Sequence, residues 1–131
     1  MIFADTGGWF ALFVPWDTNH VAAQTWHSGN SEPLLTTDFV LDEVLTLLKA
    51  RREYARALSL GTLLFGGDLA QMHRVTDGQF RRAWDVFRTF TDKDWSFTDC
   101  TSKVVMEDLG IITAFSFDQH FRQFGTITVV P

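Results

Sequence analysis

The sequence predicts a single α/β domain over residues 1–131, built as a three-layer sandwich in which a central parallel sheet is flanked by helices. Short apolar runs alternate along the chain with longer segments of helical periodicity, a pattern typical of parallel sheets with helices on both faces. The chain of 131 residues has the size of one domain, and its 46% hydrophobic residues can form a core without disulfides.

Five short segments are expected to form the strands, because cap, turn or glycine residues bound them. The fourth run, residues 111–115, is apolar without interruption, as expected of a strand that is covered on both faces. The expected strands are residues 1–4, 33–37, 71–75, 111–115 and 126–130.

N-cap residues and glycine stops define the helices of the N-terminal half. Asp17 is expected to cap a helix that extends to about Trp26. A second helix begins near Asp38, and a third follows it through Leu64 and stops at a pair of glycines.

In the C-terminal half, Asp77 begins a helix whose aromatic residues recur at helical spacing and are expected to lie mostly in the core. Thr98 is the expected N-cap of a helix over residues 99–109, and a short helix is expected over residues 118–124. The aromatic residues of the first of these helices are Phe80, Trp84, Phe87 and Phe90.

Composition and the N-terminal sequence favour a cytoplasmic protein. The single cysteine, Cys100, cannot form an internal disulfide, and no Cys/His spacing suggests a zinc site. Asp5 interrupts the apolar N-terminus and no positive side chain precedes it, which argues against a signal peptide. No apolar run reaches the roughly 18 residues that a membrane helix needs, so no membrane association is expected.

The net charge of −5 argues mildly against a nucleic-acid partner, since backbone phosphates dominate such affinity. The distribution of charge weakens this objection, because all 11 basic residues lie from Lys49 onward and gather in local clusters. An acidic total is also what a metal site built from carboxylates produces.

Four acids from distant parts of the chain are expected at one end of the sheet. Asp5 and Asp118 each follow a predicted strand, and ligand sites of open α/β sheets lie beyond the carboxyl ends of the strands. Asp99 falls in the first turn of its helix, where the helix dipole favours an anion, and Glu43 lies in an otherwise apolar helix. Carboxylates gathered in this way need a counter-cation, and hard oxygen ligands select Mg²⁺ or Mn²⁺.

Each acid also has an ordinary explanation when it is taken alone. Asp5 and Asp99 are suitable helix caps, Glu43 is a suitable solvent-facing helix residue, and Asp118 is a suitable turn residue. Position along the chain therefore supports an acidic metal site and no particular reaction.

The local sequence strings resemble the PIN-domain family, and within it the VapC-like toxins of bacterial toxin–antitoxin pairs. The resemblance extends over essentially the whole chain and rests on residues 2–6, 42–44, 96–102 and 114–121. It implies a parallel sheet sandwiched by helices and an endoribonuclease activity that depends on Mg²⁺ (or Mn²⁺). It also implies a homodimer and a small antitoxin protein that blocks the site.

The same resemblance assigns roles to individual residues. Asp5 and Asp99 would be the direct metal ligands, while Glu43 and Asp118 would bind the ion directly or through water. The positions that match supporting hydroxyls are Thr6, Ser96 and Ser116.

Two other functions are compatible with the same pattern. An Asp-based phosphotransfer domain would use Asp5 as its nucleophile, although the dehalogenase-like group needs a second Asp where this chain has Gly7. A non-catalytic component of the same fold would bind an antitoxin and repress DNA without cleaving RNA, and the intact set of acids argues against it.

Three further features have alternative explanations. His120 lies beside Asp118 and suits a general base, whereas the resemblance favours a structural role, and Cys100 is expected to be a small buried residue. The N-terminal aromatic residues are expected either to fill the core or to expose a groove for the antitoxin. These aromatic residues are Trp9, Phe13, Trp16 and Trp26.

Overall fold

A computed structural model describes all 131 residues and contains one sheet of parallel strands. The strand order is β3-β2-β1-β4-β5, and every neighbouring pair is parallel. The strands are β1 (Ile2–Ala4), β2 (Leu34–Thr37), β3 (Gln71–His73), β4 (Thr113–Phe115) and β5 (Thr128–Val130).

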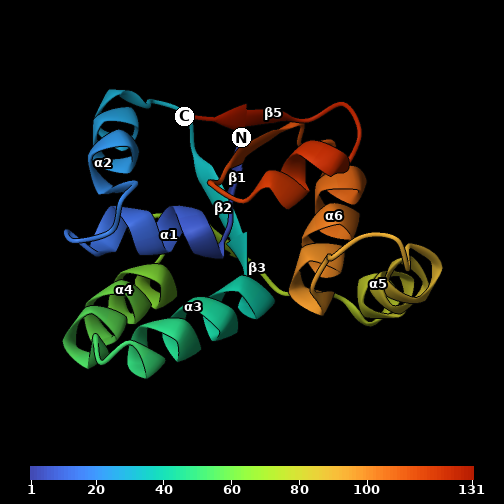
Figure 1. The fold of residues 1–131 in the computed structure, drawn as a ribbon, viewed down its shortest axis with the longest axis horizontal. Helices are drawn as coiled ribbons and strands as arrows, with labels where there is room; N and C mark the ends of the chain where they lie inside the picture. The colour runs from blue at the N-terminus through green and yellow to red at the C-terminus, as the bar shows by residue number, and fades with distance from the viewer.

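Helices cover both faces of this sheet, which confirms the expected sandwich (Figure 1). Helices α1 to α4 lie on one face, and α5, α6 and the 3₁₀ helix η1 lie on the other. The helices are α1 (Thr6–Phe13), α2 (His20–Gly29), α3 (Asp38–Ala50), α4 (Tyr54–Gly66), α5 (Asp77–Thr89), α6 (Phe97–Leu109) and η1 (Gln119–Gln123).

The neighbouring strands β1 and β4 lie at the point where the chain changes direction across the sheet. The connections from β1 to β2 and from β2 to β3 run outward one way, and the connection from β4 to β5 runs the other way. Helices therefore diverge from one another beyond the carboxyl ends of β1 and β4, which is where ligand sites of open α/β sheets form. Asp5 follows β1, and Ser116 follows β4.

The core is packed closely around these two central strands. Phe3 and Phe115 are fully buried, and Trp9 of α1 is fully buried above the sheet. The indole N–H of Trp9 donates a hydrogen bond to Thr36 Oγ1 at 3.2 Å, and that hydroxyl donates to the carbonyl of Ala4 at 2.9 Å. These bonds fix α1 against the carboxyl ends of β1 and β2.

Several predicted element boundaries were wrong. Helix α1 was not expected, and it forms because Asp5 provides an N-cap directly after β1. Helix α2 has Asn19 at its N-cap, whereas Asp17 accepts a hydrogen bond from the Asn19 backbone N–H. Ser96 caps α6 in place of Thr98, which moves the start of the helix to Phe97. Strands β3, β4 and β5 are shorter than predicted, and the last short helix is a 3₁₀ helix.

The aromatic stripe of α5 was expected in the core, and this prediction was wrong. The exposed fractions of Phe80, Trp84, Phe87 and Phe90 are 46%, 54%, 42% and 39%. Of the N-terminal aromatic residues, Trp9 is fully buried and Trp16 is 55% exposed. Helical spacing identifies one face of a helix, but it does not reveal whether another element covers that face. No helix is long and apolar enough to cross a membrane.

Gly8 allows α1 to approach β4 at close range. A Cβ atom at this position would lie 2.7 Å from the backbone oxygen of Phe115 and 2.8 Å from its ring, whereas one at Gly7 would lie 3.6 Å from Asp5 Oδ1. We expect Gly8→Ala to destabilise the protein by about 1–3 kcal/mol through overpacking. Gly7→Ala is the matched control and should be neutral or slightly stabilising, since alanine favours helix. Equal urea midpoints for the two variants would contradict this close packing.

Candidate active site

Asp5 is a buried carboxylate at the carboxyl end of β1, with only 5% of the residue exposed. Its Oδ1 accepts a hydrogen bond from the Gly8 backbone N–H at 2.9 Å, and its Oδ2 accepts one from the Ser116 hydroxyl at 2.7 Å. Burial raises the pKa of Asp5 from 3.8 to about 7, although the two hydrogen bonds oppose this shift. The nearby charges of Asp118 and Asp99 raise the pKa further.

Asp99 is held at the start of α6 by a reciprocal capping interaction. The Asp99 N–H donates to the Ser96 hydroxyl at 3.0 Å, and the Ser96 N–H donates to Asp99 Oδ2 at 3.0 Å. Burial is the main cause of a raised pKa at Asp99, and the charge of Asp118 adds to it. The hydrogen bonds from Ser96 and His120 partly offset these effects.

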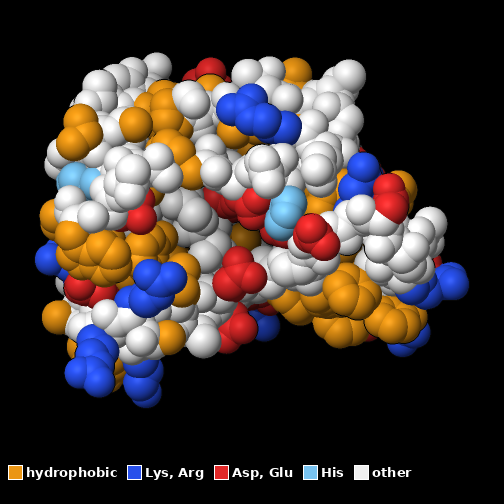
Figure 2. Space-filling model, in the orientation of Figure 1, with side chains coloured by type: hydrophobic (Ala, Val, Ile, Leu, Met, Phe, Trp, Pro, Cys, Tyr) orange, Lys and Arg blue, Asp and Glu red, His pale blue; other side chains and the backbone are white.

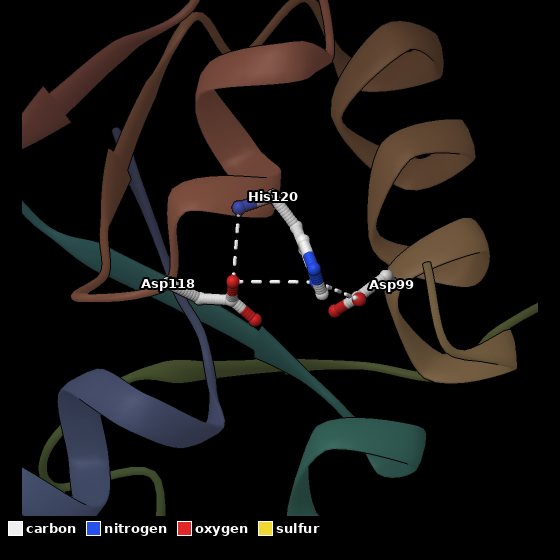
Figure 3. A group of neighbouring side chains, drawn as sticks. All are labelled: Asp99, Asp118 and His120. Atoms are coloured by element: carbon white, nitrogen blue, oxygen red, sulfur yellow. Dashed lines mark hydrogen bonds and ion pairs between the residues drawn. The ribbon is translucent and has the colours of Figure 1, made fainter. Parts of the chain in front are cut away.

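Asp118 and His120 come from the segment that follows β4, and Figure 3 shows them facing Asp99 across the site. The His120 backbone N–H donates to Asp118 Oδ1 at 2.9 Å, which caps η1. The His120 ring atom Nδ1 lies 3.1 Å from Asp99 Oδ2 and 3.3 Å from Asp118 Oδ1. Potential ligand atoms of these three residues all lie within 4.8 Å of one another.

Glu43 is connected to this group through Thr6. The Thr6 hydroxyl donates to Glu43 Oε1 at 2.5 Å, which links α3 to the first residue of α1. Glu43 is half-buried and is not part of the close group formed by Asp99, Asp118 and His120. The carboxylate of Glu43 is therefore held beside Thr6, the first residue of α1, and Thr6 directly follows Asp5 in the sequence.

The three hydroxyls that the resemblance singled out each hold an acid or its backbone. Thr6 donates to Glu43, and Ser96 caps the helix turn that carries Asp99. Ser116 donates to Asp5 and accepts from the Asp118 backbone N–H at 3.0 Å. The sequence singled out His120 beside Asp118 but did not predict that its ring contacts Asp99. Its only sequence signal was its position two residues after Asp118.

The donor set is suited to a hard divalent cation. The charge of Asp118 raises the pKa of both Asp5 and Asp99, yet none of the three acids forms an ion pair with a lysine or arginine. Figure 2 shows acidic side chains on both sides of a hollow in the middle of this face. Carboxylate oxygens without a protein counter-cation fit Mg²⁺ or Mn²⁺.

The family model described as PIN domain matches residues 2–127, so the chain belongs to the PIN-domain family. Over 131 residues it is 30% identical to VapC20 of Mycobacterium tuberculosis, named a 23S rRNA-specific endonuclease, covering 100% of this chain and 99% of that protein. It is also 32% identical over 122 residues to a VapC ribonuclease of Archaeoglobus fulgidus, covering 89% of this chain and 76% of that protein.

Solved structures agree with this assignment. The crystal structure of Mycobacterium tuberculosis VapC20, described as a sarcin-ricin loop cleaving toxin, matches with a TM-score of 0.93 at 29% identity and covers 100% of both chains. FitAcB from Neisseria gonorrhoeae matches with a TM-score of 0.70 at 12% identity over 100% of this chain and 97% of that chain, and shows the shared fold alone. Family membership removes the phosphotransfer alternative.

The raised pKa of Asp5 gives the metal-free protein a defined dependence of stability on pH. A carboxyl with a pKa of 3.8 when unfolded and about 7 when folded binds more protons in the folded state between these values. Its stabilising contribution is therefore fully present below about pH 4 and is lost as pH rises through about 7. In thermal melts with EDTA, we expect the melting temperature of the wild type to fall as the pH rises from about 4 to about 7. The melting temperature of Asp5→Asn should fall less, so this variant should melt at a higher temperature than the wild type near neutral pH.

Asp42→Asn is the matched control, because Asp42 is an exposed acid on α3. Adding Mn²⁺ at about 100 times its dissociation constant should stabilise the wild type by roughly 2.7 kcal/mol, and Asp5→Asn by less. If Asp5→Asn follows the wild-type pH dependence and gains as much from Mn²⁺, the carboxylate of Asp5 is only a helix cap.

Proposed function

We propose that this chain is a metal-dependent endoribonuclease that hydrolyses RNA phosphodiester bonds and acts as the toxin of a toxin–antitoxin pair in the cytoplasm. The observation that carries the proposal is the group formed by Asp5, Asp99 and Asp118, which has no lysine or arginine counter-ion and lies where the sheet changes direction. Similarity to VapC20 over the whole chain supports RNA as the substrate class.

The acids would hold one or more Mg²⁺ (or Mn²⁺) ions, with Asp5 and Asp99 as direct ligands and Glu43 and Asp118 binding directly or through water. When bound there, such an ion would supply a positioned water molecule and a positive charge beside the scissile phosphate. Ser116 and Ser96 fix the orientation of Asp5 and Asp99, and Thr6 fixes Glu43. These hydroxyls reduce the reorganisation that the carboxylates would otherwise need when the substrate binds.

The non-catalytic alternative differs from this proposal because it gives the buried acids no chemical role. Burial of the Asp5 carboxylate disfavours its charged form and so opposes folding. A component that only bound an antitoxin would gain nothing from such a residue. Groups whose pKa is strongly shifted by burial, with neighbouring acids adding to the shift, are typical of catalytic sites. We therefore favour hydrolysis.

The inhibiting antitoxin would bind beside α3 and α4, and Trp9 would take no part in that contact. Trp9 is fully buried and cannot line a groove. An open pocket of about 440 Å³ is lined in part by Leu41, Leu45 and Phe65, and Phe65 is 76% exposed. Such a surface suits the apolar face of a short helical segment.

A second copy of this chain would cover the aromatic face of α5, defined by Phe80, Trp84 and Phe87. This face continues onto Phe97 of α6, whose ring lies 5.5 Å from that of Phe80 and 5.9 Å from that of Phe87. Figure 2 shows the corresponding hydrophobic patch at the lower right, with basic side chains at its edge. Acids and arginines alternate beside it, in the pairs Asp77–Arg81 and Asp85–Arg88, so two copies related by a twofold axis can match opposite charges.

Cleavage assays test the proposed reaction. We expect Asp5→Asn and Asp99→Asn to cut RNA at least roughly 100-fold more slowly than the wild type, because each removes a charge that holds the metal. Asp42→Asn should cleave normally, and EDTA should abolish wild-type activity until Mn²⁺ is restored. Sustained cleavage in EDTA by protein free of contaminating nuclease would exclude the metal mechanism.

Sedimentation measurements test the proposed dimer. We expect the wild type to sediment as a dimer and Trp84→Glu to sediment as a monomer, because a charge would be buried without a partner in the apolar contact. Ile112→Glu is the matched control, since Ile112 is 64% exposed and lies outside the aromatic face. A monomeric wild type, or equal association of both variants, would show that α5 does not mediate pairing.

A further inference from the structure

We propose that His120 is a direct nitrogen ligand of the divalent ion and that it gives this site a preference for Mn²⁺ over Mg²⁺. The inference rests on the proposed metal-dependent function and concerns a residue outside the acidic set. Figure 3 shows the imidazole ring lying between the carboxylates of Asp99 and Asp118.

The distances suit three donor atoms around one ion. With metal–oxygen distances near 2.1 Å, ligand atoms at neighbouring corners of an octahedron lie about 3.0 Å apart. The Nδ1 atom of His120 lies 3.1 Å from Asp99 Oδ2 and 3.3 Å from Asp118 Oδ1. A small displacement of these side chains would therefore place all three donors in one coordination sphere.

The surrounding structure holds the ring in this orientation. The His120 backbone N–H donates to Asp118 Oδ1, which holds the residue at the start of η1. From there its ring extends toward the carboxylate of Asp99. The His120 side chain is 24% exposed, and the protein hydrogen-bonds its ring only through Nδ1. The ion would take the place of the Nδ1–H that donates to Asp99 in the metal-free site, and a neutral ring with its proton on Nε2 would then present the lone pair of Nδ1 to the ion.

A nitrogen ligand changes the relative affinities of the two candidate ions. Mg²⁺ strongly prefers oxygen ligands and retains its water shell, whereas imidazole is a good ligand for later and softer divalent ions. Removing the imidazole should therefore weaken Mn²⁺ binding more than Mg²⁺ binding. The three carboxylates alone would discriminate less between the ions.

Metal binding to the intact protein tests this role without relying on cleavage. Mn²⁺ would be titrated by calorimetry, with Mg²⁺ measured by competition, for the wild type, His120→Ala and His120→Gln. We expect both variants to bind Mn²⁺ at least about tenfold more weakly, the minimum loss that removing even an outer partner of a metal site usually causes. Mg²⁺ affinity should fall less, so the Mn²⁺/Mg²⁺ ratio should decrease.

Pulsed electron paramagnetic resonance of bound Mn²⁺ supplies the direct readout. The wild type should show coupling to a coordinated ¹⁴N nucleus, both His120 variants should lose it, and His27→Gln on α2 should keep it. Thermal melts of each variant establish that it is folded, and His120→Gln retains a polar side chain if alanine is not tolerated.

The outcomes separate this inference from the proposed function. Mn²⁺ that binds the wild type without nitrogen coupling, and binds His120→Gln equally well, would overturn the histidine ligand while leaving the nuclease intact. Absence of Mn²⁺ binding to the wild type, or binding that Asp99→Asn does not weaken, would overturn the metal site and this inference together.

Discussion

The hydroxyl of Ser116 connects the segments on which the whole site depends. It donates to Asp5 at 2.7 Å and accepts from the Asp118 backbone N–H at 3.0 Å. Asp5 also caps α1 through Gly8, so one buried series of hydrogen bonds fixes the start of α1 and the chain beyond β4. Asp5 and Ser116 are 111 positions apart, and the pairing of β1 with β4 brings them together. The pairing of β1 with β4 therefore sets both the order of the sheet and the geometry of the site.

This arrangement opposes stability in the absence of a cation. Burial raises the pKa of Asp5 and Asp99, and the charge of Asp118 raises both further, so ionising the group weakens the folded state. Replacing these acids with apolar residues would remove the penalty. The protein instead surrounds them with hydroxyl and backbone donors, which orient the carboxylates without neutralising them. An arrangement of this kind is consistent with a site that binds a positive ligand.

The sequence was sufficient for the fold class and for the neighbourhood of Asp5 and Asp118, because parallel strands carry the residues that follow them to a common edge. Asp99 was placed near them by its position in the first turn of its helix. The sequence was insufficient for α1, since Gly7 and Gly8 have low helix propensity and only the cap at Asp5 and contact with β4 stabilise that turn. The exposure of Trp84 and the ring orientation of His120 depend on which elements pack nearby. Such tertiary information is absent from local periodicity.

The acidic net charge of −5 has a consequence for RNA binding if the proposed function holds. Phosphates would be repelled by the group of Asp5, Asp99 and Asp118 until a divalent ion offsets its charge, so metal and RNA would bind cooperatively. The remaining attraction must come from basic side chains outside the site. Arg74 is a candidate, because its side chain is 85% exposed and its ion pair with Asp38 places it at the start of α3, the helix that carries Glu43. Affinity for RNA would then depend on whether the substrate can contact the exposed arginines and the loaded metal site together, so the shape of the surface around the site would set selectivity.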